Sequence, residues 1–164
     1  YKRPRKPLIA FTPKQLLRLS AAASHIDEFT SGSFQPVIGD TTITDPSAVT
    51  RVLLCTGRLY YDLAKERAHR GDTSTAIIRL EQLYPLPEAE LAEALAQYPN
   101  ATVTWVQDEP RNQGAWPHLA LNLFPSLGRP VRLVSRPESA TTAAGRASLH
   151  KEQAATLIAQ AFEG

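Results

Sequence analysis

The chain has 164 residues, 43% of them hydrophobic, so it can bury one sizeable core, and nothing in its length requires two full domains. Its formal net charge is +2, and its basic and acidic residues are mostly mixed, which gives no support to strong binding of nucleic acid. The single cysteine, Cys55, excludes a disulfide scaffold and a cysteine-based metal site.

Nothing in the sequence indicates a membrane or secreted protein. No apolar stretch approaches the ~20 residues that cross a bilayer, and the amino end has no hydrophobic signal region. These features predict a soluble, cytoplasmic protein with no membrane partner. The chain opens at Tyr1 and contains no methionine, so we expect it to be a piece of a longer polypeptide.

The first third of the chain contains few regular elements. The apolar run LIAF (8–11) predicts a short strand, after which Thr12 as N-cap and Pro13 at the first helical position open a helix over KQLLRLSAAA. Residues 30–47 are rich in Gly, Pro, Ser, Thr and Asp, which predicts a long loop. We therefore expect residues 1–47 to be the tail and linker of a preceding domain.

From there on, strand and helix patterns alternate. Strands are predicted at 49–55, 75–80, 101–106 and 130–135, and helices at 58–70, 88–98, 115–123 and 150–163, with Gly71 ending the first of these helices. Alternation of this kind predicts a three-layer α/β/α fold, with a mostly parallel, doubly wound sheet of about five strands. Residues 48–164 are expected to form this domain.

The segment WVQDEPRNQGAW (105–116) is the most informative part of the chain. It runs from a buried-strand pattern into two adjacent carboxylates, and loops beyond the carboxyl end of a strand often carry function in open α/β sheets. An ordinary strand-to-helix connection explains the pattern equally well. Asp108 and Glu109 are neighbours on an extended segment and point to opposite faces, so we expect one to bond to backbone and the other to pair with an arginine across an interface.

Other residues around these motifs are candidates for structural or interface roles. Asn112 is a candidate N-cap, Gly114 permits close backbone approach, and Trp116 is either a core residue or an anchor between subunits. In EQLYPLP (81–87) the prolines make a rigid turn that holds Glu81 for a bond to a neighbouring domain, or they simply stiffen the connection. The four histidines have no partner at metal-ligand spacing, and no GxSxG or dinucleotide-binding glycine pattern occurs.

Five motifs together resemble a known family. LIAFTPKQLLR, TGRLYYDLA, AIIRLEQLYPLP, WVQDEPRNQGAW and SRPESATTAAG followed by His150 occur in the order seen in the carboxyl-terminal part of 2-oxoglutarate dehydrogenase, the thiamine-diphosphate-dependent decarboxylating component. The chain is most similar to the actinobacterial multifunctional branch, in which an acyltransferase-like domain is fused to the decarboxylase. Asp108 stands where glutamate is usual, and Thr142 where proline is frequent.

This resemblance implies a transketolase-type C-terminal domain that builds a homodimer and its regulatory surfaces, and it implies that the domain preceding it, whose tail is residues 1–47, is a pyrimidine-binding one. The parent enzyme is expected to decarboxylate 2-oxoglutarate in the citric acid cycle and pass the succinyl group to a lipoyl acyltransferase, together with dihydrolipoyl dehydrogenase. The resemblance implies that thiamine diphosphate and magnesium are bound by other domains. The sequence agrees with this, because Gly39-Asp40 and Gly71-Asp72 are each followed by threonine and no Gly-Asp-Gly segment occurs. The present piece is expected to bind neither and to be inactive alone.

The resemblance also implies activation by acetyl-CoA, whose phosphates need cationic partners. The cluster Lys2, Arg3, Arg5 and Lys6 suits that role, although a solvated domain junction explains it as well. The expected interface residues are Glu81, Glu109, Asn112, Gly114 and Trp116. Two alternatives stay open: the same domain of a related transketolase-type 2-oxo acid dehydrogenase, and a free-standing acyl-CoA or nucleotide-binding module.

Overall fold

The computed structural model describes residues 6–7 and 9–163. The chain divides into two units, Tyr1–Gly32 and Ser33–Gly164. In the first unit, the described residues form the 3₁₀ helices η1 (Lys14–Arg18) and η2 (Ser20–Ala22) and the short helix α1 (Asp27–Thr30), and none of these elements has a buried residue. The predicted strand at 8–11 is wrong for Ile9–Phe11, which are irregular and exposed, while Leu8 lies outside the described residues.

The continuous helix predicted after Pro13 is also wrong. Leu19, with φ −88° and ψ 111°, separates η1 from η2, and Pro13 rather than Thr12 occupies the N-cap position of η1. A short helix without a packed apolar face is marginal in water, because propagation gains little until tertiary contacts bury one side. No residue of η1 or η2 is buried.

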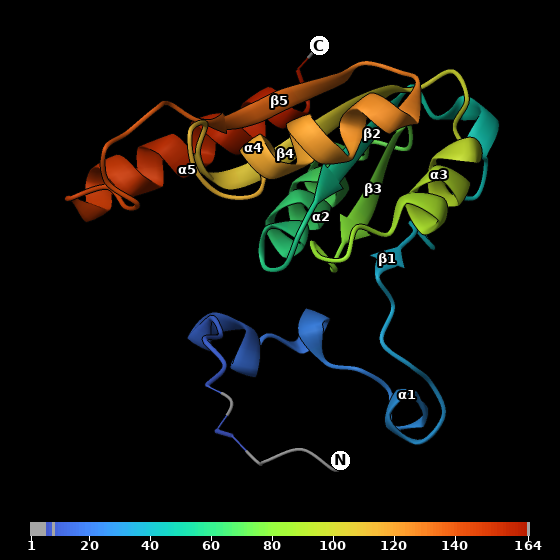
Figure 1. The fold of residues 1–164 in the computed structure, drawn as a ribbon, viewed down its shortest axis with the longest axis horizontal. Helices are drawn as coiled ribbons and strands as arrows, with labels where there is room; N and C mark the ends of the chain where they lie inside the picture. Colours follow the sequence, from blue (N-terminus) through green and yellow to red (C-terminus); the bar gives the residue numbers. More distant parts are fainter. Residues whose placement is uncertain (1–5, 8, 164) are drawn as a thin grey trace. The chain divides into compact units, whose positions relative to one another are not determined.

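The second unit is a five-stranded sheet with helices on both faces (Figure 1). The strands are β1 (Val37–Ile38), β2 (Arg51–Cys55), β3 (Thr75–Leu80), β4 (Thr102–Pro110) and β5 (Val131–Arg136), in the order β1-β3-β2-β4-β5. Only β1 is antiparallel to its neighbour. The helices are α2 (Leu59–Arg70), α3 (Glu88–Ala96), α4 (Trp116–Asn122) and α5 (Ala147–Ala161), with 3₁₀ turns η3 (Pro46–Ala48) and η4 (Phe124–Leu127).

This architecture confirms the predicted three-layer α/β/α fold. Strand residues alternate between two apolar clusters, so Val52 and Leu54 pack with α3 and α4 whereas Leu53 and Cys55 pack with α2 and α5. A parallel strand buried on both faces has a nearly continuous apolar sequence, which is the pattern of RVLLC and TAIIRL. The end of α2 is also as predicted, since Gly71 adopts a left-handed conformation with φ 61°.

Two features of the sheet differ from the prediction. The stretch 30–47 is not only loop: Val37 and Ile38 form β1, which pairs with Leu80 and Arg79 of β3. Strand β4 continues through Pro110, with a register irregularity beyond Val106, so the acidic pair lies in a strand rather than in a loop. No local pattern predicts this extension, because polar residues and a proline follow the apolar pattern that ends at Val106.

Asp40 fixes the segment around β1 to the rest of the unit. Its carboxylate accepts hydrogen bonds from the guanidinium of Arg67, from the backbone N–H of Ile77 at 2.8 Å and from both the N–H and the hydroxyl of Thr42. The side chains of Asp40 and Arg67 are only 4% and 10% exposed. Residues 33–47 therefore pack with the second unit, and the domain boundary expected at 47/48 stays a prediction.

Candidate functional site

The chain order of the strands defines where a ligand site is expected in this fold. The connection from β2 leads to β3 on one side, and the connection from β3 returns to β4 on the other side of β2. The sheet therefore has its topological switch point between β2 and β4, and ligands of open α/β sheets bind beyond the carboxyl ends of the strands at such a point. The loop Thr56–Arg58 and the acidic end of β4 meet there.

An ion pair bridges this crevice. The Arg58 guanidinium donates to Asp108 Oδ2 at 2.7 Å and also binds Asp62 on α2. Burial acts to lower the pKa of Arg58, but its bonds to Asp108 and Asp62 outweigh this effect and hold the pKa above its ordinary value. The arginine that pairs with Asp108 thus belongs to the same unit, and pairing of Glu109 with an arginine across an interface stays a prediction. Glu109 is exposed.

Glu81 is held beside this pair at the carboxyl end of β3. Its Oε1 accepts hydrogen bonds from the Gly57 N–H at 3.3 Å and from Arg79 Nε at 3.0 Å. The Arg79 guanidinium also lies over the rings of Tyr60 and Tyr61, 4.6 and 5.8 Å from their centroids. All these contacts are internal, so the predicted bond from Glu81 to a neighbouring domain stays a prediction.

The side chain of Gln107 organises the loop after β4, a role that the sequence pattern did not predict. The residue is 2% exposed, and its side-chain oxygen accepts from Trp105 Nε1 at 3.0 Å and from the Trp116 N–H at 2.9 Å. Its amide nitrogen donates to the carbonyls of Pro110 at 3.0 Å and Gln113 at 2.7 Å. All four hydrogen-bonding positions of the amide are used. The sequence contains one signal of this role: a polar residue directly follows the strand pattern TVTWV.

Gly114 closes the turn over Gln107. Its φ is 67°, and a Cβ built there would lie 2.9 Å from Glu109 Cβ and 3.1 Å from the Gln107 amide. Both the backbone conformation and the lack of space favour glycine, as the expected close approach of the backbone requires. Trp116 begins α4 half-buried, with its ring centroid 5.8 Å from that of Phe124.

Asn112 is not the N-cap of α4, because Ala115 occupies that position without a side-chain cap. Instead, Asn112 Nδ2 donates to the Ser139 carbonyl at 3.0 Å, and its Oδ1 accepts from the Ser139 N–H at 3.1 Å. Gln113 Nε2 also donates to the Ser139 carbonyl, at 2.8 Å. These bonds join the loop after β4 to the loop after β5, a pairing of distant residues that no local pattern indicates.

The basic cluster at the amino end lies almost entirely outside the described residues. Of its members, only Lys6 is described, and it is exposed. Lys2, Arg3 and Arg5 lie in the part of the chain that the structure does not describe. Their role in binding an effector stays a prediction.

The described residues contain no candidate metal site. Among them, no group of three or more His, Cys, Asp or Glu side chains is arranged to hold a metal ion. Asp40 is bound to Arg67, and Asp72 accepts hydrogen bonds from Ser74 and Thr75. Cys55 is fully buried, and this burial raises the pKa of its thiol to about 12. No described helix is long and apolar enough to cross a membrane.

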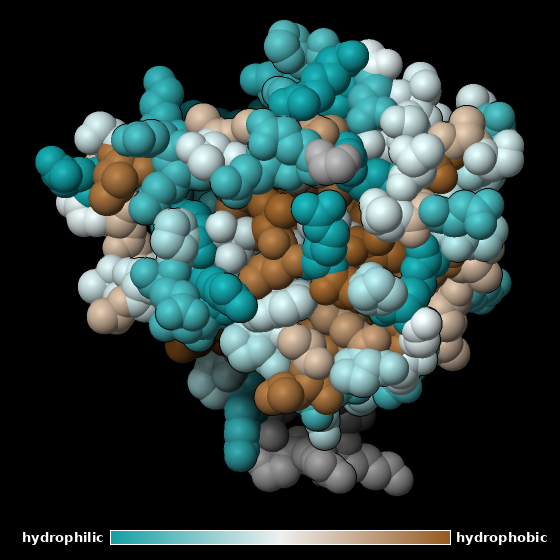
Figure 2. Space-filling view, turned by 90° about the horizontal axis from the view of Figure 1, so that it is seen from above, coloured by the Kyte–Doolittle hydropathy of each residue, from teal (hydrophilic) through white to brown (hydrophobic). Residues whose placement is uncertain are grey.

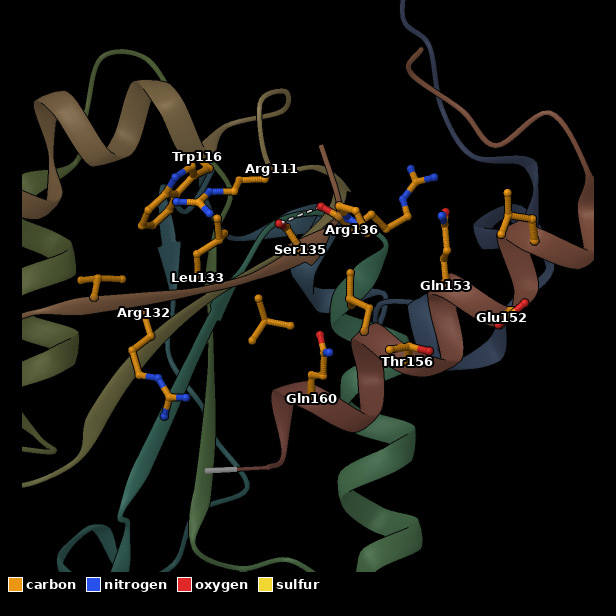
Figure 3. Close-up of a pocket in the computed structure, with 15 residues that line it drawn as sticks. Arg111, Trp116, Arg132, Leu133, Ser135, Arg136, Glu152, Gln153, Thr156 and Gln160 are labelled. Carbon is orange, nitrogen blue, oxygen red and sulfur yellow. Dashed lines mark hydrogen bonds between the residues drawn. The ribbon is translucent and has the colours of Figure 1, made fainter. Parts of the chain in front are cut away.

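A groove of about 810 Å³ lies between β5 and α5. It is lined by residues 131–137 together with Arg111, Trp116, Glu152, Gln153, Thr156 and Gln160 among others (Figure 3). Strand β5 lies at the upper side of the second unit in Figure 1, and Figure 2, seen from that side, shows apolar residues gathered between hydrophilic ones. The groove is therefore amphipathic, with Leu133, Val134 and Leu157 among its apolar residues.

Most of the chain matches a known protein family. Residues 23–162 match the family model described as 2-oxoglutarate dehydrogenase C-terminal, and this range covers the β1–β5 sheet and all four helices around it. The chain belongs to this family. The resemblance seen in the five sequence motifs is thereby confirmed.

Curated relatives of the 2-oxoglutarate dehydrogenase family match nearly the whole chain. It is 44% identical to the "2-oxoglutarate dehydrogenase E1 component" of Azotobacter vinelandii, over 96% of this chain and 17% of that protein. It is 46% identical to the "2-oxoglutarate dehydrogenase E1/E2 component" of Corynebacterium glutamicum, over 97% of this chain and 13% of that protein. A "Multifunctional 2-oxoglutarate metabolism enzyme" of Mycolicibacterium vanbaalenii is 42% identical, over 96% and 13%. The chain thus spans less than a fifth of these relatives.

Proposed function

We propose that this 2-oxoglutarate dehydrogenase C-terminal domain builds the dimer and the regulatory surface of an enzyme that decarboxylates 2-oxoglutarate with thiamine diphosphate and magnesium. Other domains hold the cofactors, and the succinyl group passes to a lipoyl acyltransferase that works with dihydrolipoyl dehydrogenase. The family match over residues 23–162 carries this proposal. The bridged switch-point crevice supports it, because Arg58 and Asp108 neutralise each other where a ligand would otherwise be recognised.

The first unit supports the view that the chain continues a preceding domain. Its large apolar side chains are exposed: Ile9 is 76% exposed, Phe11 97% and Phe29 77%. None of its helices has a buried residue. An apolar segment without a core of its own is stabilised by packing on another domain, which is the arrangement proposed for the first unit.

Helix α4 and the loop before it form the proposed dimer surface. This surface contains Asn112, Gly114 and Trp116, with Glu81 and Glu109 as further interface candidates. Leu121 on α4 is 79% exposed, whereas Leu119 of the same helix lies in the core and Trp116 and Ala120 pack against it. Apolar residues of this kind are typical of subunit interfaces.

In the full-length protein, Leu121→Glu is expected to shift the dimer towards monomer by about tenfold or more in dissociation constant, because a carboxylate would be buried at the interface. Sedimentation velocity measures the shift, and release of carbon dioxide from 2-oxoglutarate, compared with pyruvate, measures the activity. The matched control is Ala92→Glu, which adds the same charge at an exposed position of α3. If Leu121→Glu leaves the dimer intact, this surface is not the interface. Release of carbon dioxide from pyruvate alone would overturn the proposed substrate.

Acetyl-CoA is the proposed effector, bound by the cationic cluster of Lys2, Arg3, Arg5 and Lys6. Guanidinium and ammonium groups are strong partners for the phosphates of this nucleotide. Replacing both Arg5 and Lys6 by alanine is expected to weaken activation by about tenfold in effector concentration, with little change in activity without effector. Lys14→Ala, at another exposed lysine of the first unit, is the control. Unaltered activation of the Arg5 and Lys6 variant would contradict the proposal.

A further inference from the structure

Strand β5 is an edge strand with an open side. In the described part of the chain it pairs only with β4. All six residues of β5 and the following Pro137 line the groove beside it, so the groove follows the strand for its whole length of roughly 20 Å. An open edge presents unpaired backbone N–H and C=O groups, to which another extended chain can bind.

Side chains from both faces of β5 reach this groove. In Figure 3, Arg111 and Trp116 lie on one side of the β5 ribbon, whereas Arg132 and Gln160 lie on the other. Leu133 packs with the α3–α4 core, and Val134 packs with the α2–α5 core. A groove that joins both faces of a strand runs around its edge. It therefore exposes main chain as well as side chains to an incoming segment.

The charge of the groove determines which kind of extended chain can bind to it. Arg111, Arg132 and Arg136 line it, against the single carboxylate of Glu152. Arg136 is 8% exposed and its Nε donates to the Asp108 carbonyl, but it forms no ion pair with any carboxylate of the described residues. A largely buried guanidinium without an anionic partner provides a strong site for a carboxylate.

A second copy of β5 is a poor occupant of this edge. Two-fold antiparallel pairing centred near Val134 would place Arg132 of one copy opposite Arg136 of the other. Like charges directly opposite each other on neighbouring strands are destabilising. The charge of the edge therefore opposes self-pairing and favours an acidic partner.

We propose that the β5 groove binds an extended acidic segment of another polypeptide by strand addition. The main chain of the segment pairs with the free edge of β5, and its alternate carboxylates meet Arg132 and Arg136, which are on the same face of the strand. Its apolar side chains cover Leu133 and Trp116 on the opposite face. The groove shares Trp116 with the proposed dimer surface, but none of its lining residues belongs to the proposed effector cluster.

The test uses the full-length protein and a fluorescein-labelled peptide of alternating glutamate and valine, seven residues long to match residues 131–137. Fluorescence anisotropy is expected to show saturable binding that weakens with added salt. Arg132→Gln should weaken binding about tenfold, because one charge-assisted contact is lost. Lys151→Gln is the matched control, because it removes an exposed positive charge from α5 at a position that does not line the groove, and it should leave binding unchanged.

A second peptide separates strand addition from simple charge attraction. N-methylation of alternate residues on the edge that faces β5 removes hydrogen-bond donors but keeps every carboxylate, and it should abolish binding. The proposal is overturned if this peptide binds as well as the first, if a lysine–valine peptide binds equally, or if no peptide binds. It is also overturned if Arg132→Gln dissociates the dimer in sedimentation, because the groove is then an interface between copies.

Discussion

Gln107→Met is expected to lower the free energy of opening of β4 and α4 by about 3 kcal/mol, equivalent to roughly 100-fold faster hydrogen exchange there. The methionine has nearly the same length but offers no strong donor or acceptor. It would leave the Trp105 indole, the Trp116 N–H and the carbonyls of Pro110 and Gln113 without their partner. Each buried polar group without a hydrogen bond costs about 1–3 kcal/mol, although relaxation of the loop recovers part of the sum.

Hydrogen exchange measured by mass spectrometry on the full-length protein follows this opening in peptides that contain β4 and α4. Gln97→Met, at an exposed position just after α3, is the control and should leave exchange unchanged. Gln107→Glu adds a second check, since an ionised carboxylate would face the two carbonyls that Gln107 now binds. Burial raises the pKa of such a carboxyl, so this variant should be protected most below about pH 4 and lose protection as the pH rises. Unchanged exchange in Gln107→Met would show that the network does not hold the loop.

Asp40→Asn is expected to cost about 3 kcal/mol, because it leaves the buried Arg67 guanidinium without its carboxylate. Burial acts to raise the pKa of Asp40, but the hydrogen bonds from Arg67, Thr42 and Ile77 outweigh it and hold the pKa below its ordinary value. A carboxyl with a depressed folded-state pKa stabilises the fold above its unfolded pKa of about 4, and this contribution is lost as the pH falls through the folded pKa. Acid should therefore release the β1 segment in the unaltered protein.

Hydrogen exchange of β1 and β3 measures this release. Asp45→Asn is a matched control, because Asp45 accepts the same pair of bonds from Ser47 that Asp40 accepts from Thr42, but it is exposed and has no arginine partner. Adding Arg67→Met to Asp40→Asn should recover part of the lost protection, since the unpaired charge is removed. If Asp40→Asn and Asp45→Asn behave alike, the buried ion pair does not hold the segment.

The sequence by itself determined the family, the α/β class and the order of the main elements. Strands β2 and β3 are apolar on both faces, and helices α2 and α5 follow regular burial patterns, so local periodicity reported their burial correctly. Gly71 likewise marked the end of α2, because its conformation is a local property of the chain. The five motifs were sufficient to indicate the family that residues 23–162 match.

Only the tertiary structure decided the contacts between residues distant in sequence. Strand β1 is only two residues long, and it forms because it pairs with the edge of β3. In the first unit, the 3₁₀ helix η1 has no buried residue, so no tertiary packing extends it into a longer helix. Arg58 and Asp108 are 50 residues apart, and Asn112 and Ser139 are 27 apart. Their bonds depend on the order of strands in the sheet, which brings the ends of β2, β4 and β5 together. Periodicity records which side of an element is buried, but it holds no information about which polar group lies opposite.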